Sequence, residues 1–142
     1  MPVTPQQSAG TPSKSHVERV NEELRAAGAV AYNMLLPETH YLPHLIGEDE
    51  HIMGSVYRRY KDGRGVLVAT DKRILFIDKK PLFTHHDDIA YRIVSGLTRT
   101  RIGPIGTVTL RTREGSYQIR TFNQKNAKNF VNHIENEYLN KR

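Results

Sequence analysis

Residues 67–78, LVATDKRILFID, hold two short apolar runs on either side of a polar turn. The first run extends from Val66 to Thr70. The second, from Arg73 to Ile77, is apolar on both faces, as is typical of a strand in the middle of a sheet. Asp71-Lys72 supplies the turn between them. The stretch therefore predicts a β-hairpin at the centre of a sheet.

Similar short runs, separated by turn residues, continue on both sides of this hairpin. Asp62-Gly63 is a strong turn signal because both residues tolerate positive φ, and Gly103-Pro104 and Glu114-Gly115 mark two further turns. No segment between the runs is long enough for a crossover helix. The pattern predicts an antiparallel barrel or sandwich of seven strands, over residues 51–60, 66–70, 73–77, 82–89, 91–102, 105–113 and 116–122.

Helical patterns flank the predicted strands. Ser15 and Glu18 form a capping box for an N-terminal helix that ends at Gly28, and Pro37 favours a short helix over residues 38–46, whose length Pro43 limits. After the last strand, Asn123 is placed to cap a helix that reaches about residue 140. Its apolar side chains form one stripe, which would close an open end of the barrel: Ala127, Phe130, Val131, Ile134 and Tyr138.

The composition divides the chain into three parts. Residues 1–14 contain three of the seven prolines and few side chains that could be buried, which predicts a disordered tail. Residues 15–47 form a helical extension, and residues 48–142 form the β domain with its closing helix. The predicted fold class is therefore mainly β, of the α+β type.

Three stretches of this sequence carry a family resemblance. They are LPHL at 42–45 leading to EDE at 48–50, the central LVATDKRILFID, and IAYRI at 89–93. Together they resemble the YokE-like group of bacterial pleckstrin-homology (PH) domains, over residues 42–138. The resemblance implies a PH-like fold of seven antiparallel strands closed by a C-terminal helix. It also implies a non-enzymatic module that works by binding or assembly.

The chain has no Trp, whereas eukaryotic PH domains usually carry one in the closing helix. The resemblance therefore implies that Phe130 or Tyr138 fills that volume. Phosphoinositide binding is not carried over from the eukaryotic domains.

Composition and charge exclude several classes of protein. The chain has 142 residues and no Cys, so it has room for one ordinary domain and cannot form a disulfide framework or a cysteine zinc site. No apolar run could span a bilayer, and the N-terminus lacks the order of a signal peptide, so we expect a cytoplasmic protein with peripheral membrane contact as the alternative. The net charge of +6 favours anionic partners.

The positive charge belongs to the predicted β domain. Residues 1–47 contain three Lys and Arg against four Glu, a net charge of −1. Residues 48–142 contain 18 Lys and Arg against 11 Asp and Glu, a net charge of +7. Pairing between the acidic helix and the basic domain, within one chain or between chains, is thus an alternative to any external anion.

One group of cations flanks two predicted hairpin turns that lie at the same end of a meander. Six residues would surround this rim: Arg58, Arg59, Lys61, Arg64, Lys79 and Lys80. Such a rim suits a phosphate-bearing headgroup, and lipid-binding PH domains use this pair of loops. The alternative is that these are solvated hairpin ends.

A second group of cations lies on the last three predicted strands. Alternation places Thr109, Arg111 and Arg113 opposite the core residues Val108 and Leu110. Gln118 and Arg120 would share that exterior face across the next turn, and Arg99 and Arg101 could extend it if the register allows. This basic face could bind nucleic acid nonspecifically or dock an acidic protein surface, or it could be a solvated face.

The sequence contains no arrangement typical of catalysis or metal binding. His85 and His86 are adjacent and would point to opposite faces of a strand, and Pro43 lies between His40 and His44. We therefore expect no enzyme, no metal and no cofactor. The predicted function is a binding and assembly module that self-associates or binds a protein partner. Binding of anionic lipid headgroups is the first alternative and nonspecific nucleic-acid binding the second.

Overall fold

The computed structural model describes residues 11–58, 65–79 and 84–141. The described helices before the strands are α2 (Lys14–Ala26), α3 (Ala31–Met34) and α4 (Pro37–Leu45). Next come β1 (Ile52–Tyr57), β2 (Val66–Thr70), β3 (Ile74–Lys79) and β4 (Thr84–Ile89). After a 3₁₀ turn at Tyr91–Ile93, the chain forms β5 (Val94–Ile102), β6 (Ile105–Thr112) and β7 (Gly115–Thr121). The described chain ends with α5 (Gln124–Ile134) and a π-helical turn at Glu135–Leu139.

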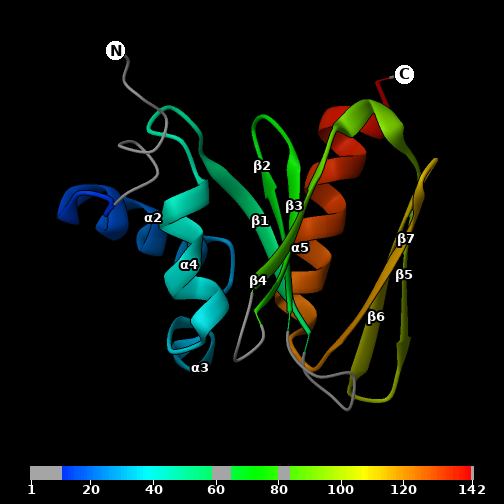
Figure 1. Ribbon diagram of the computed structural model, residues 1–142. Helices are drawn as coiled ribbons and strands as arrows, with labels where there is room; N and C mark the ends of the chain where they lie inside the picture. Colours follow the sequence, from blue (N-terminus) through cyan, green and yellow to red (C-terminus); the bar gives the residue numbers. More distant parts are fainter. Residues whose placement is uncertain (1–10, 59–64, 80–83, 142) are drawn as a thin grey trace.

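The described strands form two antiparallel sheets (Figure 1). One sheet has the order β1-β2-β3-β4 and the other has the order β5-β6-β7. Helix α5 lies between the two sheets, and α2, α3 and α4 lie beyond β1, on the side of the four-stranded sheet that faces away from β5-β6-β7 (Figure 1). The predicted class, a mainly β PH-like fold with helices at both ends, is confirmed.

An inner core fills the space between the sheets and against α5. Phe130 is fully buried there and lies directly against Gly54 of β1, where a Cβ atom would come within 3.1 Å of the Phe130 Cα. Tyr138 lies outside this core and stacks on Tyr91, with 3.5 Å between ring centroids. Phe130 is therefore the aromatic side chain at the centre of the closing helix.

A second, outer core lies on the opposite face of the four-stranded sheet. Val20 and Leu24 of α2 and Leu42 of α4 are fully buried against the sheet's outer face. The sheet contributes Tyr57, Val66, Val68, Leu75 and Ile77 to this core. Because helices cover one face and the other sheet and α5 cover the second, every residue of β2 is buried. This explains why the two runs on either side of the turn, residues 66–70 and 74–77, are apolar on both faces.

Polar contacts also attach α2 to the segment that enters β1. Arg19 donates hydrogen bonds to the carbonyl oxygens of Gly47, Glu48 and Glu50, at 2.9–3.3 Å. One turn further along the helix, the Glu23 carboxylate accepts the backbone N–H of Ile52 at 2.9 Å. The N-terminal helices are therefore joined to the β domain by both packing and hydrogen bonds.

Two details of the N-terminal helices differ from the sequence expectation. The residue that caps α2 is Ser13, whose side chain accepts the backbone N–H of His16, whereas a Ser15 cap was expected. The buried side of the helix also differs, because His16 is buried and Val17 is only partly covered. Helix α4, in contrast, agrees with the expected helix over residues 38–46: Pro37 lies in its first turn, and it ends two residues beyond Pro43.

Gly28 gives the first testable prediction, because it joins the N-terminal helices to α5. Its φ is +109°, and a Cβ atom there would lie 2.8 Å from the Asn126 Oδ1. The Gly28 carbonyl oxygen also accepts a hydrogen bond from Asn123 at 3.1 Å. We expect Gly28→Ala to lower the free energy of unfolding by about 2 kcal/mol in urea denaturation. Gly103 also has a positive φ, of +59°, but a Cβ atom there would meet no atom within 4 Å. We therefore expect Gly103→Ala to lower the free energy of unfolding by about half as much.

Candidate binding surfaces

Only part of the predicted basic rim lies within the described residues. Arg59, Lys61, Arg64 and Lys80 are outside them, as is the side chain of Lys79, the last residue of β3. Arg58 is described, and its guanidinium lies 5.4 Å from the centre of the Phe76 ring. It also donates a hydrogen bond of 3.4 Å to the Gln118 carbonyl oxygen. Arg58 is thus held against both sheets, and it does not extend freely from the hairpin.

The register of β6 and β7 places two of the predicted cations on the outer face of the three-stranded sheet. Arg111 is paired with Ser116, and Arg120 is paired with Thr107. Thr109 and Gln118 form a pair on the same face, as the alternation predicts. Arg113 lies in the turn after β6 and donates a hydrogen bond to the Arg92 carbonyl oxygen.

The register does not allow Arg99 and Arg101 to extend this face. Arg99 is paired with the buried residue Val108, and Leu97 is paired with Leu110. Paired residues share one face of a sheet, so Arg99 and Arg101 point to the inner side, although both remain exposed. The predicted cluster of five arginines is therefore divided between the two faces.

The outer face of this sheet lacks the aromatic side chains that single-stranded nucleic acid needs for stacking. Its cross-strand pairs are Thr98 with Thr109 and Thr100 with Thr107. Tyr117 of β7 belongs to the inner side, where its hydroxyl donates a 2.6 Å hydrogen bond to Asp87. Within the described strands, this face can offer hydroxyl and guanidinium groups to phosphates but no stacking platform.

Strand β5 presents an open edge. It is the terminal strand of its sheet, and its last five residues, 98–102, are all exposed. Ile102 and Ile105 flank the two-residue turn Gly103-Pro104, so they form a hydrogen-bonded pair. Because bonded and non-bonded pairs alternate, the main-chain groups of Arg99 and Arg101 point toward the open edge.

Strand β4 is the corresponding terminal strand of the other sheet, and it carries the opposite charge. Its sequence, THHDDI, contains two acidic residues, whereas β5 contains two arginines and no acidic residue. Asp87 accepts the Tyr117 hydroxyl and lies 3.0 Å from His85 Nε2. Burial and the Asp87 carboxylate raise the pKa of Tyr117. The Asp88 side chain forms a 2.8 Å ion pair with Arg73 and is 55% exposed.

The histidines do not form a metal site within the described part of the chain, where no group of three potential ligands was found. His85 and His86 pair with Asp78 and Ile77, which confirms that they lie on opposite faces of β4. His44 stacks on Tyr41, and His40 Nε2 lies 3.1 Å from the Met34 carbonyl oxygen.

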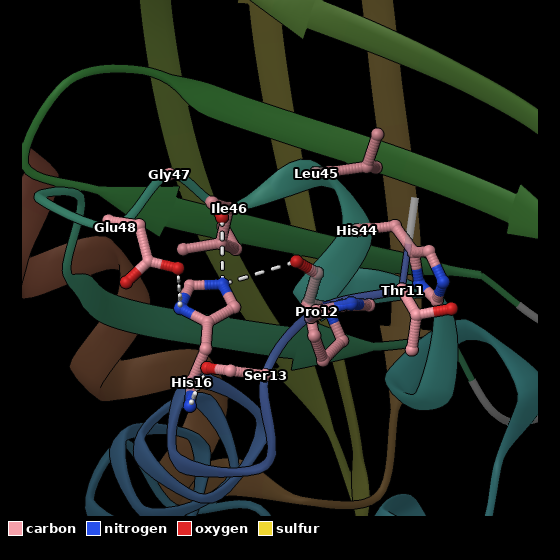
Figure 2. Close-up of a pocket in the computed structure, with 10 residues that line it drawn as sticks. Thr11, Pro12, Ser13, His16, His44, Leu45, Ile46, Gly47 and Glu48 are labelled. Atoms are coloured by element: carbon pink, nitrogen blue, oxygen red, sulfur yellow. Dashed lines mark hydrogen bonds and ion pairs between the residues drawn. The ribbon is translucent and has the colours of Figure 1, made fainter. Parts of the chain in front are cut away.

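Sequence reasoning missed His16, which lines a pocket between the start of α2 and the end of α4 (Figure 2). Its Nε2 lies 2.9 Å from the Ile46 carbonyl oxygen and 3.2 Å from that of Pro43. Carbonyl oxygens only accept hydrogen bonds, so Nε2 carries a proton. The other ring nitrogen, Nδ1, lies 3.6 Å from the Glu48 carboxylate (Figure 2). Both ring nitrogens thus have protein partners, and the role of His16 is to join α2 to α4.

The two-sheet architecture with its closing helix defines a PH-like domain, a class that generally works by binding and without catalysis. Residues 46–136 match the family described as bacterial PH domain, and the chain belongs to that family. It is also similar to a solved structure from Shewanella loihica PV-4, a DUF1696 family protein with a pleckstrin-homology domain. The identity is 16% and the TM-score 0.43, over 71% of this chain and 89% of that one. The search of curated proteins found no match. None of the described helices is long and apolar enough to cross a membrane.

Proposed function

We propose that this protein is a non-enzymatic binding module that assembles with copies of itself. In this assembly the edge of β5 in one copy pairs with the edge of β4 in the next copy. Main-chain hydrogen bonds supply the attraction, as in other cases where an extended segment adds to a sheet. The single observation that carries the proposal is that the two open edges have opposite charge.

Charge complementarity selects this pairing over the alternatives. Pairing β5 with a second β5 would bring Arg99 and Arg101 close to the same residues of the partner, and like charges across a sheet are destabilising. Pairing β5 with β4 brings these arginines, which share one face, to a strand that carries one acidic side chain on each face, Asp87 and Asp88. Cross-strand pairs of opposite charge contribute roughly 0.2–1 kcal/mol each.

The contact is head to tail, since one copy uses β5 and the other uses β4. In such a pair, the copy that uses β5 keeps a free β4 edge, and its partner keeps a free β5 edge. The contact repeats until it closes into a ring or continues as a filament. Assembly of this type would also allow a different protein with an acidic edge strand to add to β5.

Charge reversal at the β5 edge tests the proposal. We expect light scattering of the wild-type protein to show a mass that rises with concentration, and Arg99→Glu/Arg101→Glu to remain a monomer. The matched control is Arg111→Glu/Arg120→Glu, which changes the net charge equally on the outer face and should still assemble. A wild-type protein that is a monomer at every concentration, or equal loss of assembly in both variants, would contradict the proposal.

A further inference from the structure

The large apolar side chains that remain exposed are concentrated in three segments of the chain. Six such residues are exposed in the described part of the protein, by 45–82%. Five of them lie in residues 25–36, 101–106 and 120–128: Val30, Tyr32, Leu35, Ile102 and Phe122. The sixth, Met53, lies near the start of β1.

These three segments meet at one end of the molecule. Asn123, next to Phe122, donates a hydrogen bond to the Gly28 carbonyl oxygen at 3.1 Å. Gln124 donates one to the Pro104 carbonyl oxygen at 2.8 Å, in the turn after Ile102. A shallow hollow is lined by Val30, Asn33 and residues 121–124, which connects the first and third segments. In Figure 1 this is the lower end, with α3, the start of α5 and the β5–β6 turn.

The same three segments are exclusively cationic. They contain no Asp and no Glu, and they contain five basic residues: Arg25, Arg101, Arg120, Lys125 and Lys128. The four of these other than Arg120 are exposed. By contrast, Met53 follows a segment, residues 48–50, that is entirely acidic. Exposed apolar side chains and positive charge therefore occur together at this end.

We propose that this end docks on the surface of an anionic lipid bilayer, with Leu35, Tyr32 and Phe122 entering the interface. Aliphatic and aromatic side chains surrounded by Lys and Arg are the composition of interfacial membrane contacts. Tyr fits the headgroup level because its ring is apolar and its hydroxyl is hydrated. Phe and Leu fit the apolar side of the same interface. A soluble protein partner would need acidic groups around an apolar centre, whereas a bilayer supplies both features over an extended surface.

The surface differs from the rim of hairpin loops considered from the sequence. It is built by the N-terminal extension, the β5–β6 turn and the start of α5. It shares Arg101 and Ile102 with the end of β5 but includes no residue of β4. Leu35 and Lys125, which test it, lie outside both edge strands, so the two proposals can fail independently.

The absence of Trp from the chain permits a direct test. Leu35→Trp and Met53→Trp each introduce a single fluorophore, at 75% and 45% exposed positions at the two ends. With phosphatidylglycerol vesicles we expect the emission of Leu35→Trp to move to shorter wavelength, and that of Met53→Trp to stay unchanged. Phosphatidylcholine vesicles should shift neither. No shift with anionic vesicles, or an equal shift in both variants, would overturn the proposal.

Two further measurements separate a bilayer from other occupants. In vesicle sedimentation, Leu35→Ser should lower the partition coefficient about tenfold, whereas Met53→Ser should leave it within about twofold. Lys125→Glu should also weaken binding, and added salt should reduce it. If the Leu35→Trp emission shifts with protein concentration alone, a second copy covers the patch, and the membrane proposal is wrong.

Discussion

Arg73→Met is expected to lower the free energy of unfolding by about 3 kcal/mol and the Tm by about 10 °C. Arg73 binds the Glu50 carboxylate through two hydrogen bonds, both of 2.9 Å, and also donates to the Leu45 carbonyl oxygen at 2.8 Å. The Glu50 side chain is only 3% exposed. Removal of the guanidinium would leave a buried carboxylate without its main partner. An unpaired buried charge strongly destabilises the folded state.

Lys72→Met is the matched control for this variant. Lys72 is the neighbouring residue, and its ion pair with Asp49 joins side chains that are 50% and 86% exposed. Exposed pairs contribute little, so this variant should change stability by less than about 0.5 kcal/mol. The double variant Arg73→Met/Glu50→Leu should be more stable than Arg73→Met alone, because no buried charge remains. Equal stability of Arg73→Met and Lys72→Met in urea denaturation would contradict the stabilising role given to the buried pair of Arg73 and Glu50.

The same pair predicts a pH dependence. Burial opposes ionisation of Glu50, but hydrogen bonds from Arg73, Thr70 and the Gly47 N–H outweigh it and hold the pKa below its ordinary value of 4.5. A carboxyl with a lowered pKa stabilises the folded state fully above the unfolded pKa, and this contribution is lost as pH falls through the folded pKa. The stability difference between wild type and Glu50→Gln should therefore be complete above about pH 5 and decrease below pH 4.5.

Removal of residues 1–47 should abolish cooperative folding of the remaining chain, residues 48–142. The family match begins at residue 46, which makes this a natural place to cut. However, the cut would expose the outer face of the four-stranded sheet, including Val66, Val68 and Leu75, which are fully buried in the intact protein. Because only one of the two apolar faces of this sheet would then be buried, the shortened chain is expected to aggregate or to bind hydrophobic dyes.

Point variants make this prediction independent of the choice of cut. Leu24→Ala removes a fully buried side chain of α2 and should cost about 3 kcal/mol. Leu35→Ala changes the same residue type at a 75% exposed position and should leave stability within about 0.5 kcal/mol. A cooperative thermal transition for residues 48–142, close to that of the full chain, would show that the domain folds without its helical cover.

Local patterns predicted the strands and α5 because each signal lies within a few residues. The turn residues and the apolar stripe through Phe130 are examples. The outer core could not be predicted in the same way, since β1, the strand that α2 contacts, begins 26 residues after the end of α2. The apolar character of residues 67–78 on both faces was visible in the sequence, but it does not say which element covers the second face.

The division of the basic face shows where alternation fails as a guide. Along β5, no apolar residue follows Leu97 until Ile102. Alternation counted back from Ile102 places Arg99 and Arg101 on the outer face with Arg111, whereas alternation counted from Leu97 places them on the inner face. Ile102 is in fact 82% exposed, and the pairing of Arg99 with Val108 turns both arginines to the other side. Only the register reveals this.

The head-to-tail assembly can be tested most directly by mixing two variants that each lack one edge. Arg99→Glu/Arg101→Glu changes the β5 edge and retains β4. His85→Lys/His86→Lys adds positive charge to the β4 edge, keeps Asp87 and Asp88, and retains β5. Each variant alone should have the mass of a monomer in light scattering. The mixture should form a one-to-one dimer through the remaining β4 and β5 edges, and a mixture that stays monomeric would contradict the account.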